Sequence, residues 1–162
     1  MEAYFNPIAM LVAAFSALVV GFIWYNPKVF GNAWIKSAGL SETELKGGNM
    51  VKIFGLALLF AFMLSSALPG IVIHQAGALS LVGGDPTKAL PSYDVFISDY
   101  ANAFRTFKHG ALHGVLTGIF VVLPILGTNA LFERKGAKYI FINSGYWIVT
   151  LAIMGGIICV WK

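Results

Sequence analysis

Apolar residues dominate four long runs of the chain, and shorter polar segments separate these runs. The runs cover about residues 7–25, 51–76, 109–132 and 139–161, and none of them contains Asp or Glu. A helix needs about 20 predominantly apolar residues to cross the hydrocarbon core of a bilayer. We therefore expect a single all-α transmembrane domain over residues 1–162, a four-helix bundle with short interfacial helices in its loops.

Prolines interrupt the second and the third run. Pro69 precedes Gly70, and Pro124 lies in the middle of the third run. Proline has no main-chain N–H, so it would leave the carbonyl four residues earlier, at Ser65 or Phe120, without its helical partner. We expect a kink in each of these two helices.

Small residues form rows on two of the predicted helices. Gly110, Gly114 and Gly118 recur every four residues, so they share one helix face and would let another backbone approach closely. A second face of this kind, in the fourth run, holds Gly145, Val149, Ala152 and Gly156. A helix that meets only lipid needs no such row, and we expect both faces to pack against other helices.

Two short helices are predicted between the first and second runs. Asn26 and Pro27 are typical of an N-cap and a first helical residue, and they predict an interfacial helix that ends near Ser37. The spacing of Ser41 and Glu44 is that of a capping box, which predicts one more helical turn.

Aromatic residues recur at helical spacing between Ser92 and Phe107. They predict an amphipathic helix that leads directly into the third run. The favoured interpretation is a helix that rests on lipid, as amphipathic helices at membrane surfaces do. A lid over the end of the bundle is the alternative.

Composition excludes a soluble domain. The chain is 58% hydrophobic and 11% charged, with a mean hydropathy of +0.79, which is more apolar surface than a soluble domain of 162 residues can cover. The net charge of +4 indicates loops beside anionic lipids, so we expect membrane lipids and no nucleic acid as partners. Cys159, the only cysteine, is expected to be an inert buried thiol. No basic residue precedes the first run, so no cleavable signal peptide is expected.

Basic residues predict the orientation, because they gather in loops on the cytoplasmic side. One side holds seven of them, which are Lys28, Lys36, Lys46, Lys52, Arg134, Lys135 and Lys138. The opposite side holds four, which are Lys88, Arg105, Lys108 and Lys162. Both termini are therefore predicted to lie outside.

The histidines are candidates for a site. His109 and His113 lie one helical turn apart, and the predicted topology places His74 at the same side of the membrane, near Asp94 and Asp99. An i, i+4 pair suits a shared metal ion. Since the spacing fixes no third ligand, we favour hydrogen bonding to water, headgroups or a neighbouring helix, with a metal or proton site as the alternative.

A second polar group is predicted at the opposite side, where Asn26, Asn129, Glu133, Arg134 and Asn143 gather. Polar side chains often join membrane helices by hydrogen bonds, and this is the favoured interpretation. A substrate site is the alternative.

Motifs of enzymes are missing from the sequence. It contains no Gly-x-Ser-x-Gly, no phosphate-binding loop and no His-Glu-x-x-His. No acidic residue lies within a predicted span, where a proton-coupled transporter usually carries one. We therefore expect no enzymatic activity, no catalytic or cofactor-binding residues, and no cofactor.

Segments at both ends of the chain resemble a known family. The segment GFIWYNPKVFGNAW, from Gly21, is similar to the opening signature of the mostly bacterial membrane family called domain of unknown function 1761. NALFERK from Asn129, YIFINSGYW from Tyr139 and IMGGI from Ile153 resemble it too. The resemblance implies four spans over the whole chain, in a bacterial cytoplasmic membrane, and it brings no established activity.

Two hypotheses about function follow. The favoured one is assembly, as a homo-oligomer or as an accessory subunit of a larger membrane complex, because of the rows of small residues and the aromatic loop helix. The alternative is a small-solute transporter or channel, whose path would be lined by the kinked spans two and three. Four spans are few for a monomeric carrier, so either hypothesis implies more than one copy.

Overall fold

The computed structural model describes residues 4–161, and within this range the side chains of Glu42 and Lys46 are excepted. Helices, joined by short turns, are the regular structure of the described residues, which form no strand. Four helical segments are long and apolar enough to cross a membrane, at Pro7–Trp24, Met50–Val72, Phe107–Phe132 and Ala137–Val160. The predicted all-α fold with four spans is therefore confirmed.

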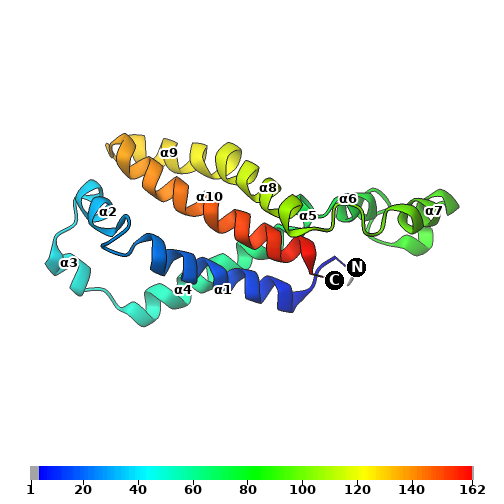
Figure 1. Ribbon diagram of the computed structural model, residues 1–162, viewed down its shortest axis with the longest axis horizontal. Helices are drawn as coiled ribbons and strands as arrows, with labels where there is room; N and C mark the ends of the chain where they lie inside the picture. Colours follow the sequence, from blue (N-terminus) through cyan, green and yellow to red (C-terminus); the bar gives the residue numbers. More distant parts are fainter. Residues whose placement is uncertain (1–3, 162) are drawn as a thin grey trace.

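The four spans pack side by side in the order third, fourth, first and second. α10 (Ala137–Val160) packs along α8 (Phe107–Thr117) and α9 (Leu123–Phe132) on one side and along α1 (Pro7–Trp24) on the other. α4 (Met50–Ala67) then packs against α1. Figure 1 shows α10 between α9 and α1, with α4 diverging from it.

The two ends of this row carry different connections. One end holds the start of α1, the end of α10, α6 (His74–Leu81), the 3-10 turn η1 (Pro86–Lys88) and α7 (Pro91–Tyr100), and we call it the α6 end. The other holds α2 (Gly31–Ala38) and α3 (Glu42–Lys46), and we call it the α2 end (Figure 1). Lys135 of the α9–α10 connection donates from Nζ to the main-chain oxygen of Ala38 over 2.7 Å, which holds α2 against the bundle.

Three spans begin with a side-chain cap. Asn6 accepts hydrogen bonds from the main-chain N–H groups of Ile8 and Ala9 at the start of α1. Asn49 caps α4 in the same way, and Thr106 caps α8. Each cap supplies an acceptor to an N–H that has no partner within its own helix.

The predicted distortion of the third span is a π turn. η2 (Gly118–Val122) lies between α8 and α9, and the N–H of Leu123 donates to the oxygen of Gly118, five residues earlier. Pro124 follows directly and has no N–H of its own, which favours a local change of helix type before it. The span as a whole still runs without a gap from Phe107 to Phe132.

The second span breaks later than predicted. Helical hydrogen bonds continue past Pro69, since the N–H of Val72 donates to the main-chain oxygen of Leu68 over 2.9 Å. Pro69 is the first residue of α5 (Pro69–Val72), a position where a helix needs no N–H donor. The chain becomes extended at Ile73, with φ −113° and ψ 103°. The predicted range to residue 76 is therefore too long, because α6 is a separate helix.

The predicted helix start at Asn26 is wrong. The side chain of Asn26 accepts from the N–H of Lys28, and its carbonyl accepts from Val29 and Gly31, so these residues form a turn before α2. Asn favours such local bonds over helix formation. The first residue of α2, Gly31, has to be glycine, because a Cβ there would overlap the main-chain oxygen of Tyr25. The capping box between Ser41 and Glu44 is confirmed.

The predicted helix from Ser92 to Phe107 is also shorter than expected. α7 ends at Tyr100, and a turn leads to Phe104, whose φ of 60° is left-handed. The side chain of Gln75 donates hydrogen bonds to the main-chain oxygen of Tyr100, the last residue of α7, and to that of Ala103 in the turn that follows.

Candidate functional site

Three histidines meet at the α6 end of the molecule. His74 is the first residue of α6, and His109 and His113 lie one turn apart on α8. The ring centroids are 4.8 Å apart for His74 and His109, 5.2 Å for His74 and His113, and 4.5 Å for His109 and His113. One ligand nitrogen from each ring lies within 4.8 Å of the others. We call these three residues the histidine cluster; Asp94 and Asp99, exposed on α7, lie outside it.

His74 reaches the cluster because of the break before it and a buried neighbour after it. The extended conformation of Ile73 turns α6 away from the second span. Gln75, only 3% exposed, donates from Nε2 to the main-chain oxygens of Tyr100, over 2.6 Å, and Ala103, over 2.9 Å. These bonds fix the start of α6 to the turn after α7, so His74 is held where α8 begins.

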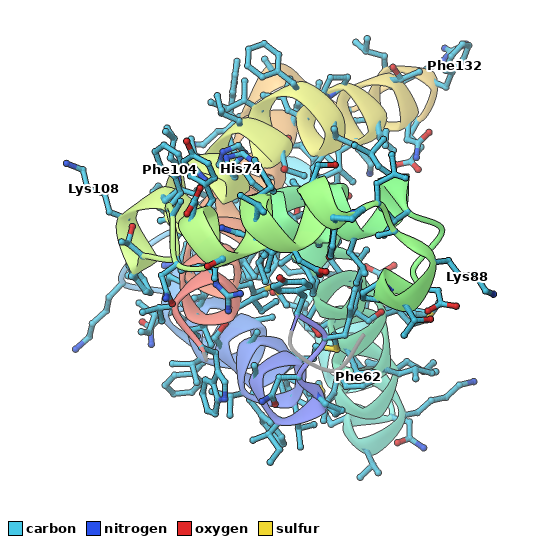
Figure 2. The ribbon with its side chains drawn as sticks, turned by 90° about the vertical axis from the view of Figure 1, so that its right-hand side faces the viewer. Phe62, His74, Lys88, Phe104, Lys108 and Phe132 are labelled. Atoms are coloured by element: carbon cyan, nitrogen blue, oxygen red, sulfur yellow. The ribbon has the colours of Figure 1, made fainter. Side chains whose placement is uncertain are left out.

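Phe104 borders the histidine cluster on that turn. Its ring centroid lies 5.7 Å from that of His74 and 5.1 Å from that of His109. Figure 2 shows Phe104 beside His74, whereas Lys108 points away from the molecule. A left-handed backbone at a non-glycine residue costs about 1–3 kcal/mol, and such residues often occur at functional sites.

The next residue joins this turn to the last span. Arg105 is 9% exposed and donates from Nε to the main-chain oxygen of Cys159, over 2.8 Å, and from Nη2 to that of Trp161. The buried thiol of Cys159 lies 3.4 Å from the main-chain oxygen of Phe104. The start of α8 and the end of α10 are therefore tied together beside the cluster.

The imidazoles are poorly supplied with protein hydrogen bonds. The Nε2 atom of His109 is buried and has no partner among the described residues. His113 accepts a bond at its main-chain oxygen from Thr117, over 2.8 Å, and among residues 4–161 its ring makes no hydrogen bond to a neighbouring helix. The structure thus brings the three histidines together and leaves Nε2 of His109 without a protein partner among the described residues.

The glycine row of α8 faces α10 at very close range. A Cβ on Gly110 would overlap the main-chain carbonyl of Gly155, and one on Gly114 would overlap that of Leu151. A Cβ on Gly118 would lie 2.7 Å from Cγ1 of Ile148. This seam fixes the backbone on which His109 and His113 stand.

The predicted row on α10 meets two different neighbours. A Cβ on Gly145 would lie 2.9 Å from Cζ2 of Trp24, on α1, and one on Gly156 would lie 2.5 Å from Cε2 of Phe107, on α8. Both glycines therefore accommodate aromatic rings. Gly155, which was not part of the predicted row, is the glycine that meets the backbone of α8.

The polar residues of the α2 end fall into separate places. Asn129, Glu133 and Asn143 line one pocket of about 160 Å³ between α9 and α10. Asn143 accepts a hydrogen bond from the hydroxyl of Tyr25 over 3.0 Å and donates to the main-chain oxygen of Tyr139 over 2.8 Å. Burial raises the pKa of Tyr25, so its hydroxyl stays a donor.

The other two predicted members lie outside that pocket. Asn26 forms the turn before α2, and Arg134 adopts a left-handed conformation, with φ 58°, after α9. A further tie between spans one and four at this end is Trp24, which donates from Nε1 to the main-chain oxygen of Ile142 over 3.0 Å.

An apolar groove of about 590 Å³ opens between α1, α4 and α10 toward the α2 end. It exists because α4 leaves α10 while it stays packed against α1 (Figure 1). We call it the apolar groove; its walls include Ala17, Gly21, Ala57, Phe60, Tyr146 and Trp147. No sequence pattern pointed to it, although the small residues Ala57 and Ala61 repeat at the four-residue spacing on α4.

Comparison with known proteins identifies the chain at the level of the family. Neither a curated protein nor a solved structure matches it. The family described as "Protein of unknown function (DUF1761)" matches residues 8–159, a range that begins in the first span and ends in the last. The fold and the sequence match agree over nearly the whole length, and the chain belongs to the DUF1761 family.

Proposed function

We propose that this integral membrane protein has no enzymatic activity and works as a subunit of a membrane assembly, most simply a homo-oligomer. The observation that carries the proposal is the apolar groove, because the four spans do not close around it. A second copy of the chain would fill this groove with part of one of its own helices.

Small residues on both walls favour a helix as the occupant. Ala13 and Ala17 of α1 and Ala61 and Ser65 of α4 pack tightly where the two helices touch, and Ser65 donates to the main-chain oxygen of Met10 over 2.9 Å. The rows continue with Gly21 and Ala57 into the groove. Small side chains allow close helix approach, whereas lipid chains require none.

The exposed side chains of α4 support the same proposal. Phe54 is 57% exposed and Phe60 is 59% exposed, and both line the groove. Aromatic residues that stand free on a monomer commonly form the buried centre of an interface. Symmetric pairing, the commonest arrangement of oligomers, would place the α4 of each copy beside the groove of the other.

The orientation belongs to the same proposal. Seven basic residues lie in or beside the connections at the α2 end. Lys88, Arg105 and Lys108 lie at the α6 end, and the fourth basic residue of this set, Lys162, falls outside the described residues. The α2 end would face the cytoplasm of a bacterial cell, and the α6 end, with both termini, would face outward. Membrane lipids would surround the remaining apolar surface.

Transport of a small solute is the second candidate. The π turn of the third span and the break after α5 in the second favour it, because interrupted helices often form binding sites in transporters. This candidate also requires more than one copy, since residues of the third span do not line the apolar groove.

Disulfide crosslinking tests the assembly proposal. In a Cys159→Ser background, Ala57→Cys in the groove wall should give crosslinked dimers in membranes, and native mass spectrometry should show more than one copy. Ile125→Cys is a control, since it stands seven residues from the α2 end of its span, as Ala57 does, and is 57% exposed. A monomeric protein with only lipid bound, and equal crosslinking of the two variants, would contradict the proposal.

A further inference from the structure

We propose that the histidine cluster binds one Zn²⁺ ion at the α6 end, with three imidazole ligands and a fourth position open to water or a small anion. His74, His109 and His113 come from two separate helices and converge without any other metal-ligating residue in the group. This site goes beyond the proposed assembly and does not depend on it.

The distances fit a tetrahedral ion after a small adjustment of the side chains. Zinc binds imidazole nitrogen at about 2.0–2.1 Å, so ligand nitrogens around a tetrahedral ion stand about 3.4 Å apart. The ligand nitrogens of the cluster already lie within 4.8 Å of one another. Rotation of three imidazoles can close a gap of this size, and His74 is exposed.

The backbone beneath the three ligands is held from several directions. Thr106 caps α8, the glycine row locks α8 against α10, and Gln75 fixes the first turn of α6. A metal site needs ligands carried by rigid elements, because otherwise binding must order them first. The rings can therefore adjust while their Cα positions stay in place.

The donor set selects the kind of metal. Three neutral nitrogen ligands suit Zn²⁺ and its neighbours among the transition metals, whereas Mg²⁺ and Ca²⁺ require oxygen ligands. Asp94 and Asp99 are outside the cluster, and the thiol of Cys159 lies 3.3 Å from the main-chain oxygen of Val72, in the core. Three protein ligands with one open position is the arrangement that zinc adopts when it keeps a water or another exchangeable ligand.

The surroundings favour an ion over hydrogen bonds alone. Nε2 of His109 is buried without a partner among the described residues, and a buried polar atom in that state costs free energy. An ion coordinated by Nε2 itself would accept the lone pair of this nitrogen and supply the missing partner. Arg105 is engaged with the end of α10, and Lys108 points away, so neither cation faces the cluster (Figure 2).

Phe104 shields one side of the site. Its ring lies within 5.7 Å of His74 and 5.1 Å of His109, measured between centroids, on a backbone with a left-handed φ. An apolar ring beside a metal site limits the access of water and strengthens the bonds to the ion. His74 is exposed, so an ion can reach the cluster beside it.

Calorimetric titration with ZnCl₂ tests the site. The protein, purified in mild detergent with an affinity tag that contains no histidine and then washed with chelator, should bind one Zn²⁺ per chain. Co²⁺ in its place should give the visible absorption of a tetrahedral complex, and Mg²⁺ should not bind. Each of His74→Gln, His109→Gln and His113→Gln should weaken binding at least about 10-fold.

Lys108→Gln is the matched control, because Lys108 precedes His109 and points away from the cluster. It should bind Zn²⁺ as the parent protein does. If His109→Gln does not fold, the exposed residue His74 decides the question through His74→Gln. Absence of Zn²⁺ binding in the folded parent protein, or unchanged affinity in His74→Gln and His113→Gln, would overturn the proposal.

Discussion

Arg105 donates a hydrogen bond from Nε to the main-chain oxygen of Cys159, over 2.8 Å, and thereby caps the last turn of α10. The final carbonyls of a helix have no partner within the helix and carry a partial negative charge. The buried guanidinium supplies donors and the opposite charge at once. It also joins the residues just before α8 to the end of α10, next to the glycine seam, since Cys159 is also a neighbour of Gly110.

Replacement of Arg105 by Gln should destabilise the protein by about 2 kcal/mol, because hydrogen bonds to a charged group contribute about 1.5–3 kcal/mol. Thermal unfolding in detergent would measure the loss. Lys108→Gln removes an exposed positive charge three residues away and should leave the midpoint nearly unchanged. Equal midpoints for the two variants would show that the Arg105 contact contributes little.

Gly114→Leu should disrupt the seam between α8 and α10, since even a Cβ at this position would overlap the main chain of Leu151. Forced overpacking of a tight contact costs about 1–3 kcal/mol or more. Val115→Leu, on the neighbouring position, should have a much smaller effect. Unfolding midpoints in detergent that do not differ between the two variants would count against the seam.

Gly55 offers the opposite case, because a Cβ there meets open space. Gly55→Ala should be neutral or stabilise α4 by up to about 1 kcal/mol, from helix propensity. Gly114→Ala should destabilise in the same assay. A loss of stability in Gly55→Ala would indicate a close neighbour of α4, as a second copy would provide.

The stability of the folded protein should depend on pH through Tyr25. Burial raises its pKa in the folded protein above the usual value of about 10, so the stability that the neutral hydroxyl contributes is present below that pH. It is lost as the pH rises above about 10, because the unfolded chain then releases the proton more readily. Tyr25→Phe, which also loses the bond to Asn143, should show a lower midpoint at pH 8 and a smaller decline above pH 10.

The orientation can be checked by labelling. In a Cys159→Ser background, Lys88→Cys at the α6 end should react with an impermeant thiol reagent in intact cells, and Lys36→Cys at the α2 end should not. Both lysines are exposed, so accessibility within the protein does not limit either reaction. The reverse pattern would invert the proposed topology.

The spans were predictable because each depends on one property, the length of an apolar run. The start of the first loop helix was not predictable, because Asn26 can cap a turn as readily as a helix. Its hydrogen bond with the N–H of Lys28 shows that it caps a turn. The sequence predicted that the histidines lie at the same side of the membrane, but not that their rings meet. Topology placed His74 near His109, but the meeting of their rings depends on the extended Ile73 and on the buried side chain of Gln75.

Arg105 and Gln75 were missed although each left a signal. Gln75 is a polar residue that follows His74 at the end of an apolar run, and Arg105 interrupts an aromatic segment. Both positions suggest a buried polar contact. Their partners are main-chain oxygens of Tyr100, Ala103, Cys159 and Trp161, and main-chain partners leave no mark in a sequence.

The π turn at Gly118–Val122 changes the phase of the third span. It holds one residue more than an α turn, and each residue of a helix turns the chain by about 100°. In a regular helix, Ile125 and Asn129 would lie on the same face as Gly118. In the actual span, Gly127 and Ala130 face α10 instead: a Cβ added to Gly127 would lie 3.7 Å from Cγ2 of Ile140, and Ala130 is buried. The third span is therefore two helices that are one residue out of step, and each half presents its own small residues to α10.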